Sequence, residues 1–420
     1  MVNEEPLPGW AYKGLPPGCE EAPGRLGELG WNVLAGDTGT PVAILRAGAL
    51  AANLAVMAEF CRRHRVSLAP HAKTTMSPEL TAMQRDAGAW ALTAATAQQV
   101  AAMAEFGAPR ILLANELTDP GALRWLAGLL AAPAAPEVVW YVDSTAGVAL
   151  AEEAFGAAPP GRRPRVLVEV GHASGRTGAR TLDLALAVAE AVHRSDRLDL
   201  LGVAGYEGTI SPVRDARAEA AVREFLALMS GTFTAAHRGG LLAPGLEPVV
   251  TAGGSIYFDL VAGAFAPLRE LGARIVLRSG CYLTHDHGTY AASSPSRAPG
   301  WDLPEFQPAI EVWGRVLSRP EPGLALVNFG RRDVSFDAGL PVPLWTCRRG
   351  SLTPQPAAGL AVTGLSDQHA FVRLPDDHPL APGDLLGAGI SHPCTTFDRW
   401  RLLLLTDDSY RVTGAARTFF

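Results

Sequence analysis

The chain has 420 residues, of which 48% are hydrophobic and 19% are charged, so we expect sizeable cores and exclude a globally disordered protein. A net charge of −6 argues against nucleic acid as a partner. The acidic, Pro-rich start lacks a secretory-signal pattern and the apolar runs are too short to span a bilayer, so we expect no membrane association. Five scattered cysteines predict reduced thiols and a cytoplasmic location.

Strand-like and helix-like runs alternate over the first two thirds of the chain. The predicted strands cover residues 41–45, 67–70, 90–93, 110–114, 138–142, 165–170, 200–204, 248–251 and 275–278. About eight strand–helix units over roughly 240 residues match the size of a TIM barrel, which we place at residues 40–300. An open doubly wound sheet is the structural alternative. Its dinucleotide-binding form is disfavoured because no Gly-x-Gly-x-x-Gly follows the first strand.

The sequence pattern changes after about residue 300. Short alternating runs at residues 309–317, 324–329, 371–374, 385–390 and 400–405 are separated by clusters of Gly, Pro and Asp. This pattern predicts an antiparallel β domain over residues 301–420. Residues 1–39 are rich in Gly and Pro, and we expect them to pack against that domain.

Lysine is rare in this chain. Only Lys13 and Lys73 are lysines among 36 basic residues. Arginine stays charged at any working pH, whereas lysine can act as a neutral amine nucleophile. Lys13 lies in a loop-like segment rich in Gly and Pro, while Lys73 lies between a predicted strand and a predicted helix that begins at Ser77-Pro78. We therefore expect Lys73 to carry chemistry.

The chemistry of a TIM barrel occurs where its strands end. The predicted strand ends carry His71, Lys73, Asp143, Glu169, Arg176, Tyr206, the stretch Gly253-Gly254-Ser255, Arg278 and Tyr282. Backbone amides in a small-residue loop can approach a phosphate closely, although the Gly pair could equally be a plain tight turn. A lysine and a phosphate loop are the minimum for binding pyridoxal 5′-phosphate (PLP).

An ordered set of motifs resembles the fold-type III PLP enzymes, in the D-threonine aldolase and D-serine dehydratase (amino acid deaminase) branch. The motifs are Pro70-His71-Ala72-Lys73-Thr74, Glu169-Val170-Gly171 with Arg176-Thr177-Gly178, Gly205-Tyr206-Glu207-Gly208, Thr251-Ala252-Gly253-Gly254-Ser255, Arg278-Ser279-Gly280-Cys281-Tyr282 with Asp286, Ser366-Asp367-Gln368-His369, and His392-Pro393-Cys394 after Gly383-Asp384. Residues 41–45 resemble the opening barrel strand of the family. The resemblance covers residues 40–400 and implies an α/β, alanine-racemase-like fold.

The resemblance assigns provisional tasks to individual residues. Lys73 would hold PLP as a Schiff base, and Gly253, Gly254 and Ser255 would hold its phosphate. The residues that would line the cofactor are Arg176, Tyr206 and Tyr282. The sequence departs from the family at Thr209, where His is usual, and at Gln368 and Ala370, which puts the acid/base partner and the substrate in question.

A second candidate site is the pair His392 and Cys394. Positions two apart in an extended segment point the same way, and imidazole and thiolate suit zinc. Spacing alone favours a buried Cys beside a satisfied His, since two ligands are fewer than usual. The resemblance implies a divalent metal over the PLP face, zinc with manganese as the alternative, where it could bind the substrate's β-hydroxyl.

Other histidines are harder to assign. His71 could be an acid or could only pack beside the lysine, and His369 could belong to the same site. His285 and His287 flank Asp286, and we interpret this stretch as a solvated turn rather than a metal cluster.

The resemblance implies a lyase of small amino acids. We expect metal-assisted dehydration and deamination of a β-hydroxy D-amino acid, such as D-serine, D-threonine or 3-hydroxyaspartate, to a keto acid and ammonia. A retro-aldol cleavage to glycine and an aldehyde is the alternative, and Cys394 favours dehydration because the aldolases it resembles tend to carry Asp there. A non-catalytic PLP-binding protein is a further alternative, and the β domain argues against it. The family also implies a homodimer.

Overall fold

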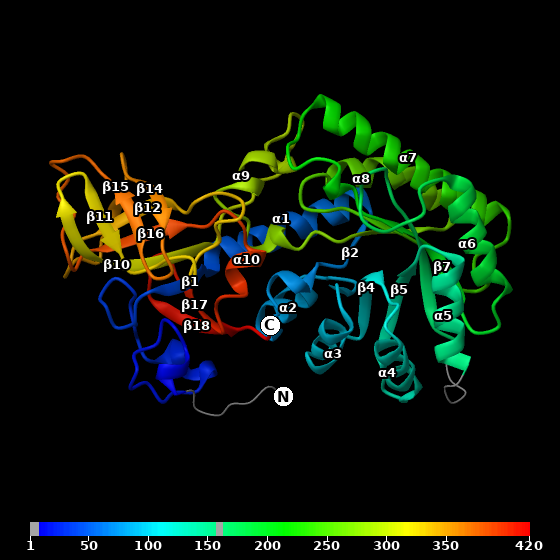
Figure 1. Ribbon diagram of the computed structural model, residues 1–420, viewed down its shortest axis with the longest axis horizontal. Helices are drawn as coiled ribbons and strands as arrows, with labels where there is room; N and C mark the ends of the chain where they lie inside the picture. The colour runs from blue at the N-terminus through cyan, green and yellow to red at the C-terminus, as the bar shows by residue number, and fades with distance from the viewer. Residues whose placement is uncertain (1–7, 157–162) are drawn as a thin grey trace.

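The computed structural model describes residues 8–156 and 163–420, and residues 1–7 of the predicted N-terminal segment lie outside them. Figure 1 shows a barrel of strands surrounded by helices on one side of the molecule and a β domain on the other, with the long helix α1 (Ala47–His64) running between them.

Eight parallel strands form the barrel, in the order β2-β9-β8-β7-β6-β5-β4-β3. They are β2 (Ser67–Leu68), β3 (Leu92–Ala94), β4 (Arg110–Glu116), β5 (Glu137–Val142), β6 (Arg165–Val170), β7 (Asp199–Gly205), β8 (Val249–Ala252) and β9 (Arg274–Leu277). A parallel bridge between His71 and Thr93 joins the two edge strands, so the sheet closes on itself. The predicted TIM barrel is confirmed.

Helices follow the barrel strands and cover the outside. They are α2 (Pro78–Asp86), α3 (Ala97–Glu105), α4 (Pro120–Ala131), α5 (Thr145–Gly156), α6 (Leu182–Arg194), α7 (Ala216–Arg238) and α8 (Phe258–Phe265). Ser77 and Pro78 begin α2 as predicted, because the Ser77 hydroxyl accepts the Leu80 N–H at 3.4 Å. Among the described residues, we find no helix whose length and apolar character would let it cross a membrane.

The β domain contains a largely antiparallel sheet of ten strands, which confirms the predicted second domain. Besides β1 (Val42–Arg46) these are β10 (Ile310–Glu321), β11 (Leu324–Val327), β12 (Val342–Cys347), β13 (Gln355–Pro356), β14 (Ala361–Leu365), β15 (Ala370–Arg373), β16 (Leu385–Gly389), β17 (Leu402–Thr406) and β18 (Val412–Arg417). The sequence pattern missed β12, β13, β14 and β18. The short helices α9 (Thr289–Ser293) and α10 (Cys394–Phe397) lie on the side that faces the barrel (Figure 1).

The predicted first strand of the barrel belongs to the other domain. Strand β1 lies between β10 and β17 in the β-domain sheet, antiparallel to the first and parallel to the second. Its first four residues are all buried, with Val42 and Ile44 in one core and Ala43 and Leu45 in another. A strand buried on both faces has the same apolar sequence in either sheet, so the pattern could not distinguish them. The barrel therefore begins at β2, and its predicted start at residue 40 is wrong.

The described part of the N-terminal segment packs on the β domain. Leu15, Leu26 and Leu34 are buried in a small core that also contains Val42 and Trp313. An isolated bridge from Asn32 to Arg411, which precedes β18, ties the segment to the sheet edge. The segment therefore covers the outer face of the β-domain sheet.

A buried asparagine connects α1 to the segment that leads into the β domain. The Asn53 side chain is fully buried, and its amide donates to the carbonyls of Leu283 and Gln307 at 2.9 and 2.7 Å. Its oxygen accepts the Gln307 N–H at 2.7 Å. Three backbone groups thus depend on one side chain.

We expect Asn53→Ala to lower the melting temperature by roughly 5 °C or more. The change leaves these backbone groups buried without partners, at a cost of about 2–4 kcal/mol. Differential scanning fluorimetry measures the effect, with the exposed Gln98→Ala on α3 as the control. Equal melting temperatures for both variants would contradict this account of Asn53.

Candidate active site

A hollow of about 760 Å³, counted with its open mouth, lies at the carboxyl ends of the barrel strands. It is lined by residues that directly follow the strands and by residues of the β-domain side. The first group contains His71, Lys73, Thr74, Tyr206, Gly253, Gly254, Ser255, Arg278, Ser279, Gly280 and Cys281, together with Ala114, Tyr141, Glu169 and Arg176, and the second contains Tyr290, His392 and Cys394. The fold therefore brings together nine of the predicted site residues, since all except Tyr282 and His369 line this one hollow.

Lys73 lies in a single 3-10 turn that begins where β2 ends. Its Nζ forms no hydrogen bond or ion pair with any described residue. Lys13, by contrast, donates to the Asp333 carboxylate at 2.9 Å and lies 4.2 Å above the Trp400 ring, so it stabilises the β domain. The neighbouring His71 is half-buried, and the desolvation of its ring holds the pKa of the imidazole well below the usual value. His71 is therefore neutral at physiological pH.

His392 and Cys394 both line the hollow, although the chain between them is not extended. Pro393 has helical backbone angles, and Cys394 begins α10, so the predicted reason for their convergence is wrong. The His392 Nδ1 lies 2.6 Å from the Asp337 carboxylate, which in turn accepts the Thr395 hydroxyl at 2.7 Å. This contact orients the ring and leaves Nε2 available to a ligand.

A second thiol, that of Cys281, lies next to the His392–Cys394 pair. The Cys281 and Cys394 sulfurs are 3.6 Å apart, and the Thr74 hydroxyl lies 3.4 Å from Cys394. The hydrogen bond from Cys281, followed by those from His392 and Thr74, holds the pKa of the Cys394 thiol well below its usual value. The bond to Cys394 and the nearby Asp337 raise the pKa of His392 to about 9. Cys394 is thus a thiolate beside the protonated imidazole of His392. A bound metal ion would take the place of that imidazole proton.

Comparison with known proteins places both domains in characterised families. Residues 45–241 match the alanine racemase N-terminal domain, and residues 309–406 match a putative serine dehydratase domain. The D-threonine aldolase of an Arthrobacter species is 28% identical over 366 residues, which cover 86% of each chain.

Solved structures agree with this placement. The D-threonine aldolase of Filomicrobium marinum has a TM-score of 0.77 at 26% identity, with 94% of this chain and 98% of that chain covered. The D-threo-3-hydroxyaspartate dehydratase of a Delftia species has a TM-score of 0.74 at 22% identity over 92% and 99% of the chains, and a cysteine-to-alanine variant of such a dehydratase was solved in a metal-free form. Over both domains the chain is similar to the fold-type III PLP-dependent lyases, in the branch of D-threonine aldolase and serine dehydratase.

The residues of the hollow fit PLP, with one revision. The Lys73 amine is unpartnered, and the Arg176 guanidinium lies 4.8 Å from the centre of the Tyr206 ring without a hydrogen-bond partner among the described residues. The amides of Gly253 and Gly254, however, donate to the buried Glu207 carboxylate at 3.0 and 2.6 Å. These two N–H groups are therefore committed within the protein.

The two glycines are still required for space. Gly253 has φ +100°, and a Cβ on Gly254 would lie 3.0 Å from the Tyr206 ring. The hydroxyl and amide of Ser255 have no hydrogen-bond partner among the described residues, so they remain free for a phosphate. In the predicted phosphate loop, Ser255 would therefore be the donor, and Gly253 and Gly254 would let the backbone approach.

The residues also fit a divalent metal. An imidazole fixed by a carboxylate and a thiolate with a lowered pKa are the ligand types that zinc prefers. Both groups reach the hollow that Lys73 lines, which links a metal site to the cofactor site.

Tyr282 and His369 do not reach the hollow within this chain. Tyr282 is buried on the other side of its turn, where its hydroxyl accepts from the Gln84 amide at 3.2 Å. His369 is exposed in the turn between β14 and β15. The prediction that Tyr282 lines the cofactor site is therefore wrong. His369 does not line the hollow of its own chain either.

Two residues that line the hollow were not predicted from the sequence, Tyr290 and Cys281. Tyr290 is carried by α9, whose first amides are capped by the Asp286 carboxylate. The sequence Asp-x-Gly before a short polar helix was the available signal for this cap. Cys281 had no such signal, because its partners Thr74 and Cys394 come from distant segments.

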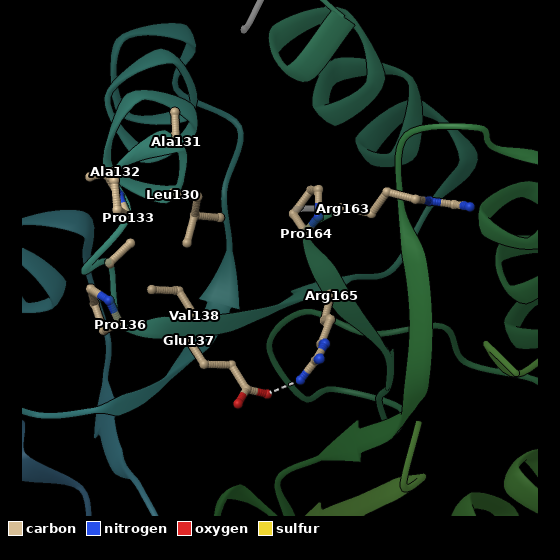
Figure 2. A pocket seen from close by; sticks show the side chains of 11 residues that line it. Leu130, Ala131, Ala132, Pro133, Pro136, Glu137, Val138, Arg163, Pro164 and Arg165 are labelled. Atoms are coloured by element: carbon tan, nitrogen blue, oxygen red, sulfur yellow. Dashed lines mark hydrogen bonds and ion pairs between the residues drawn. The ribbon is translucent and has the colours of Figure 1, made fainter. Parts of the chain in front are cut away.

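A second hollow lies at the opposite ends of the barrel strands, between α4 and the starts of β5 and β6. Figure 2 shows that it is lined largely by apolar residues and that its charged residues Glu137 and Arg165 face one another in an ion pair. Glu137 also pairs with Arg110 at 3.0 Å. The third charged residue of the hollow, Arg163, pairs with Asp199 at 3.2 Å, so among the described residues no charged group of this hollow is free for catalysis.

The predicted solvated turn at residues 285–287 is wrong. His285 and Asp286 are buried, and the His285 ring stacks on Phe306 with centroids 6.3 Å apart. Burial lowers the pKa of His285 to about 4 and raises the pKa of Asp286 to about 6. Among the described residues this stretch is not a metal cluster either, since the one group of three or more close ligand atoms lies at Glu116, Asp143 and Glu169.

We expect His285→Phe to reduce the loss of stability in mild acid. The unfolded His285 binds a proton near pH 6.5 and the folded one only near pH 4, so the wild type loses up to about 1.4 kcal/mol per pH unit between these values. Phe keeps the stacking contact with Phe306 but cannot bind a proton, so this loss of stability on acidification disappears. Denaturant unfolding at pH 7 and pH 5 measures it, with exposed His193→Gln as the control. Equal losses in His285→Phe and wild type would refute the assignment.

Proposed function

We propose that the chain is a PLP-dependent lyase that dehydrates a β-hydroxy D-amino acid to a keto acid and ammonia. The observation that carries the proposal is that the Lys73 amine and the His392–Cys394 pair line one hollow. A reaction at Cα and a leaving group at Cβ need chemical groups at both places. The names of the relatives support a β-hydroxy amino acid as the substrate class.

Lys73 would hold the cofactor covalently and, once released by the substrate amine, remove the Cα proton. PLP supplies an electron sink for the carbanion at Cα. Arg278 is unavailable to the substrate's carboxylate, because it donates to Thr251 and to the Gly205 carbonyl at 2.7 and 2.6 Å. Arg176 forms no ion pair with any described residue and would hold a negative group of the cofactor or substrate.

His71 would not act as an acid in this scheme. Its imidazole is neutral, and its Nδ1 has no hydrogen-bond partner among the described residues. A neutral ring beside Lys73 avoids a second positive charge there, which favours the free amine that a base requires.

A metal held by His392 and Cys394 would polarise the β-hydroxyl and make it a better leaving group. We propose zinc, since one thiolate and one imidazole are softer ligands than manganese prefers. Cys394 also favours dehydration, because the aldolases that the sequence resembles tend to carry Asp at this position. Two protein ligands leave coordination positions open for substrate, as a catalytic site requires.

Retro-aldol cleavage is the second candidate. It is favoured by the Arthrobacter relative, which is 28% identical and is named as a D-threonine aldolase. Both reactions use the same cofactor, and they differ in whether the Cβ–O bond or the Cα–Cβ bond breaks. A non-catalytic PLP-binding protein is disfavoured by the match of residues 309–406 to a serine dehydratase domain.

We further propose a cytoplasmic homodimer. All five cysteines are free thiols, which suits a reducing compartment. A second subunit could bring its β domain, and with it His369, to the mouth of the barrel.

We expect the enzyme to release equal amounts of keto acid and ammonia from D-serine, D-threonine or D-threo-3-hydroxyaspartate, and not from their L-isomers. Mass spectrometry and an ammonia assay identify the products. Lys73→Arg keeps the charge and should still lower kcat/KM by about 10³-fold or more, because arginine cannot act as a neutral amine. Glycine and an aldehyde without ammonia would reject dehydration and establish the aldolase.

We expect a chelator to abolish turnover while the visible absorption of PLP remains, and zinc to restore activity. Asp337→Asn should weaken zinc binding by about 10–100-fold, since the His392 ring loses a charged partner. Competition with a zinc indicator measures the affinity. The control is Asp408→Asn, which removes an exposed partner of Arg46 away from the hollow. An unchanged zinc affinity in Asp337→Asn would argue against His392 as a ligand.

A further inference from the structure

A cluster of three carboxyl groups lies beside the cofactor hollow and is used by none of the steps above. Glu116 ends β4, Asp143 follows β5, and Glu169 lies near the end of β6. One ligand oxygen from each lies within 4.8 Å of the others. Three consecutive barrel strands thus aim acidic side chains at one point.

These carboxyl groups have no cationic partner among the described residues, and burial together with the neighbouring Asp143 and Glu169 raises the pKa of Glu116 to about 9. Among the described residues, no Lys, Arg or His side chain forms an ion pair with Glu116, Asp143 or Glu169. The one hydrogen bond from outside the cluster to a side-chain oxygen is the Gly178 N–H, which donates to Asp143 at 2.9 Å. Glu169 is buried and the other two are half-buried, and carboxylates at this spacing are unfavourable unless a proton or a cation lies between them.

Two buried oxygen atoms point to a ligand rather than to a solvated acidic patch. Glu169 is 7% exposed, and its Oε2 is buried without a hydrogen-bond partner. Tyr141 is 1% exposed, and its hydroxyl is likewise unpartnered; it lies close enough for Glu169 and Glu116 to affect its ionisation. Buried polar atoms are rarely left unpaired, so something should satisfy these two.

We propose that Glu116, Asp143 and Glu169 bind a hard divalent cation, of the Mg²⁺ or Mn²⁺ type, at a site separate from the His392–Cys394 pair. Carboxylate oxygens suit these ions, whereas thiolate and imidazole suit zinc. The Tyr141 hydroxyl and water would complete the coordination. The enzyme would then hold two metals of different chemistry on two sides of one hollow.

The cation would act by fixing a loop. Asp143 holds the Gly178 amide, and residues 171–178 carry Arg176 into the hollow. A cation on Asp143 would therefore hold that loop. This function is structural and does not depend on which bond of the substrate breaks.

The test is manganese binding to the PLP-loaded protein with the other site removed. In the His392→Ala/Cys394→Ser background, stripped with a chelator, we expect about one Mn²⁺ per chain in an electron paramagnetic resonance titration of free Mn²⁺. Adding Glu169→Gln, or Glu116→Gln, should weaken this binding by about tenfold or more. Glu137→Gln is the matched control, since Glu137 is a barrel carboxylate paired with two arginines, and it should leave binding unchanged.

Two results would overturn the inference. One is that the double variant binds no Mn²⁺, so that the cluster holds only a shared proton. The other is that Mn²⁺ binds equally well after Glu169→Gln and Glu116→Gln while PLP absorption and melting temperature show that both variants are folded. Neither result bears on the proposed reaction, because the readout involves no turnover.

Discussion

The contact between Thr74 and Cys394 joins two separate sheets at the point where chemistry is expected. Thr74 follows the lysine at the end of β2, and Cys394 begins α10 of the β domain. The barrel alone offers an amine and a place for a phosphate. The imidazole and thiolate come from the other domain. A complete site therefore exists only while the β domain remains seated on the barrel mouth, which α1 and the buried Asn53 help to maintain.

This arrangement explains why some parts of the site could be predicted from sequence. Strand-end positions follow from apolar alternation, and Lys73 stands out because arginine has replaced almost every other lysine. His392 and Cys394 were recognised by resemblance, and they do converge, but through a helical turn that spacing rules did not anticipate. Local patterns specify which residues end a strand, and these ends share one face of a barrel.

Other parts depend on contacts that no local pattern encodes. Strand β1 is apolar because two cores enclose it, so its sequence suits either sheet. The stretch at residues 285–287 is polar in sequence, yet it is buried under Phe306 and capped onto α9. Tyr282 and Tyr290 are eight positions apart along the chain, and only the direction of the turn decides that Tyr290 reaches the hollow. The hydrogen bonds from the Gly253 and Gly254 amides to the Glu207 carboxylate could not be predicted either, because the partners are more than forty residues apart in the sequence.

The hollow has two chemically different sides. Thiols and imidazole face it from the β domain and from the turn after β9, and carboxyl groups approach it from β4 to β6. Lys73 lies between them without a partner of its own. A group that bonds this amine covalently would satisfy the arrangement, and the other lysine of the chain is already held by Asp333 and Trp400.

Borohydride reduction of the PLP-loaded protein, followed by peptide mapping, tests this central claim most directly. Reduction fixes the cofactor to the amine that holds it, and the chain has only one other lysine. The account predicts a pyridoxyl mass on the peptide that contains Lys73 and none on the peptide that contains Lys13. A label on Lys13, or no labelled lysine in protein that carries PLP, would contradict it.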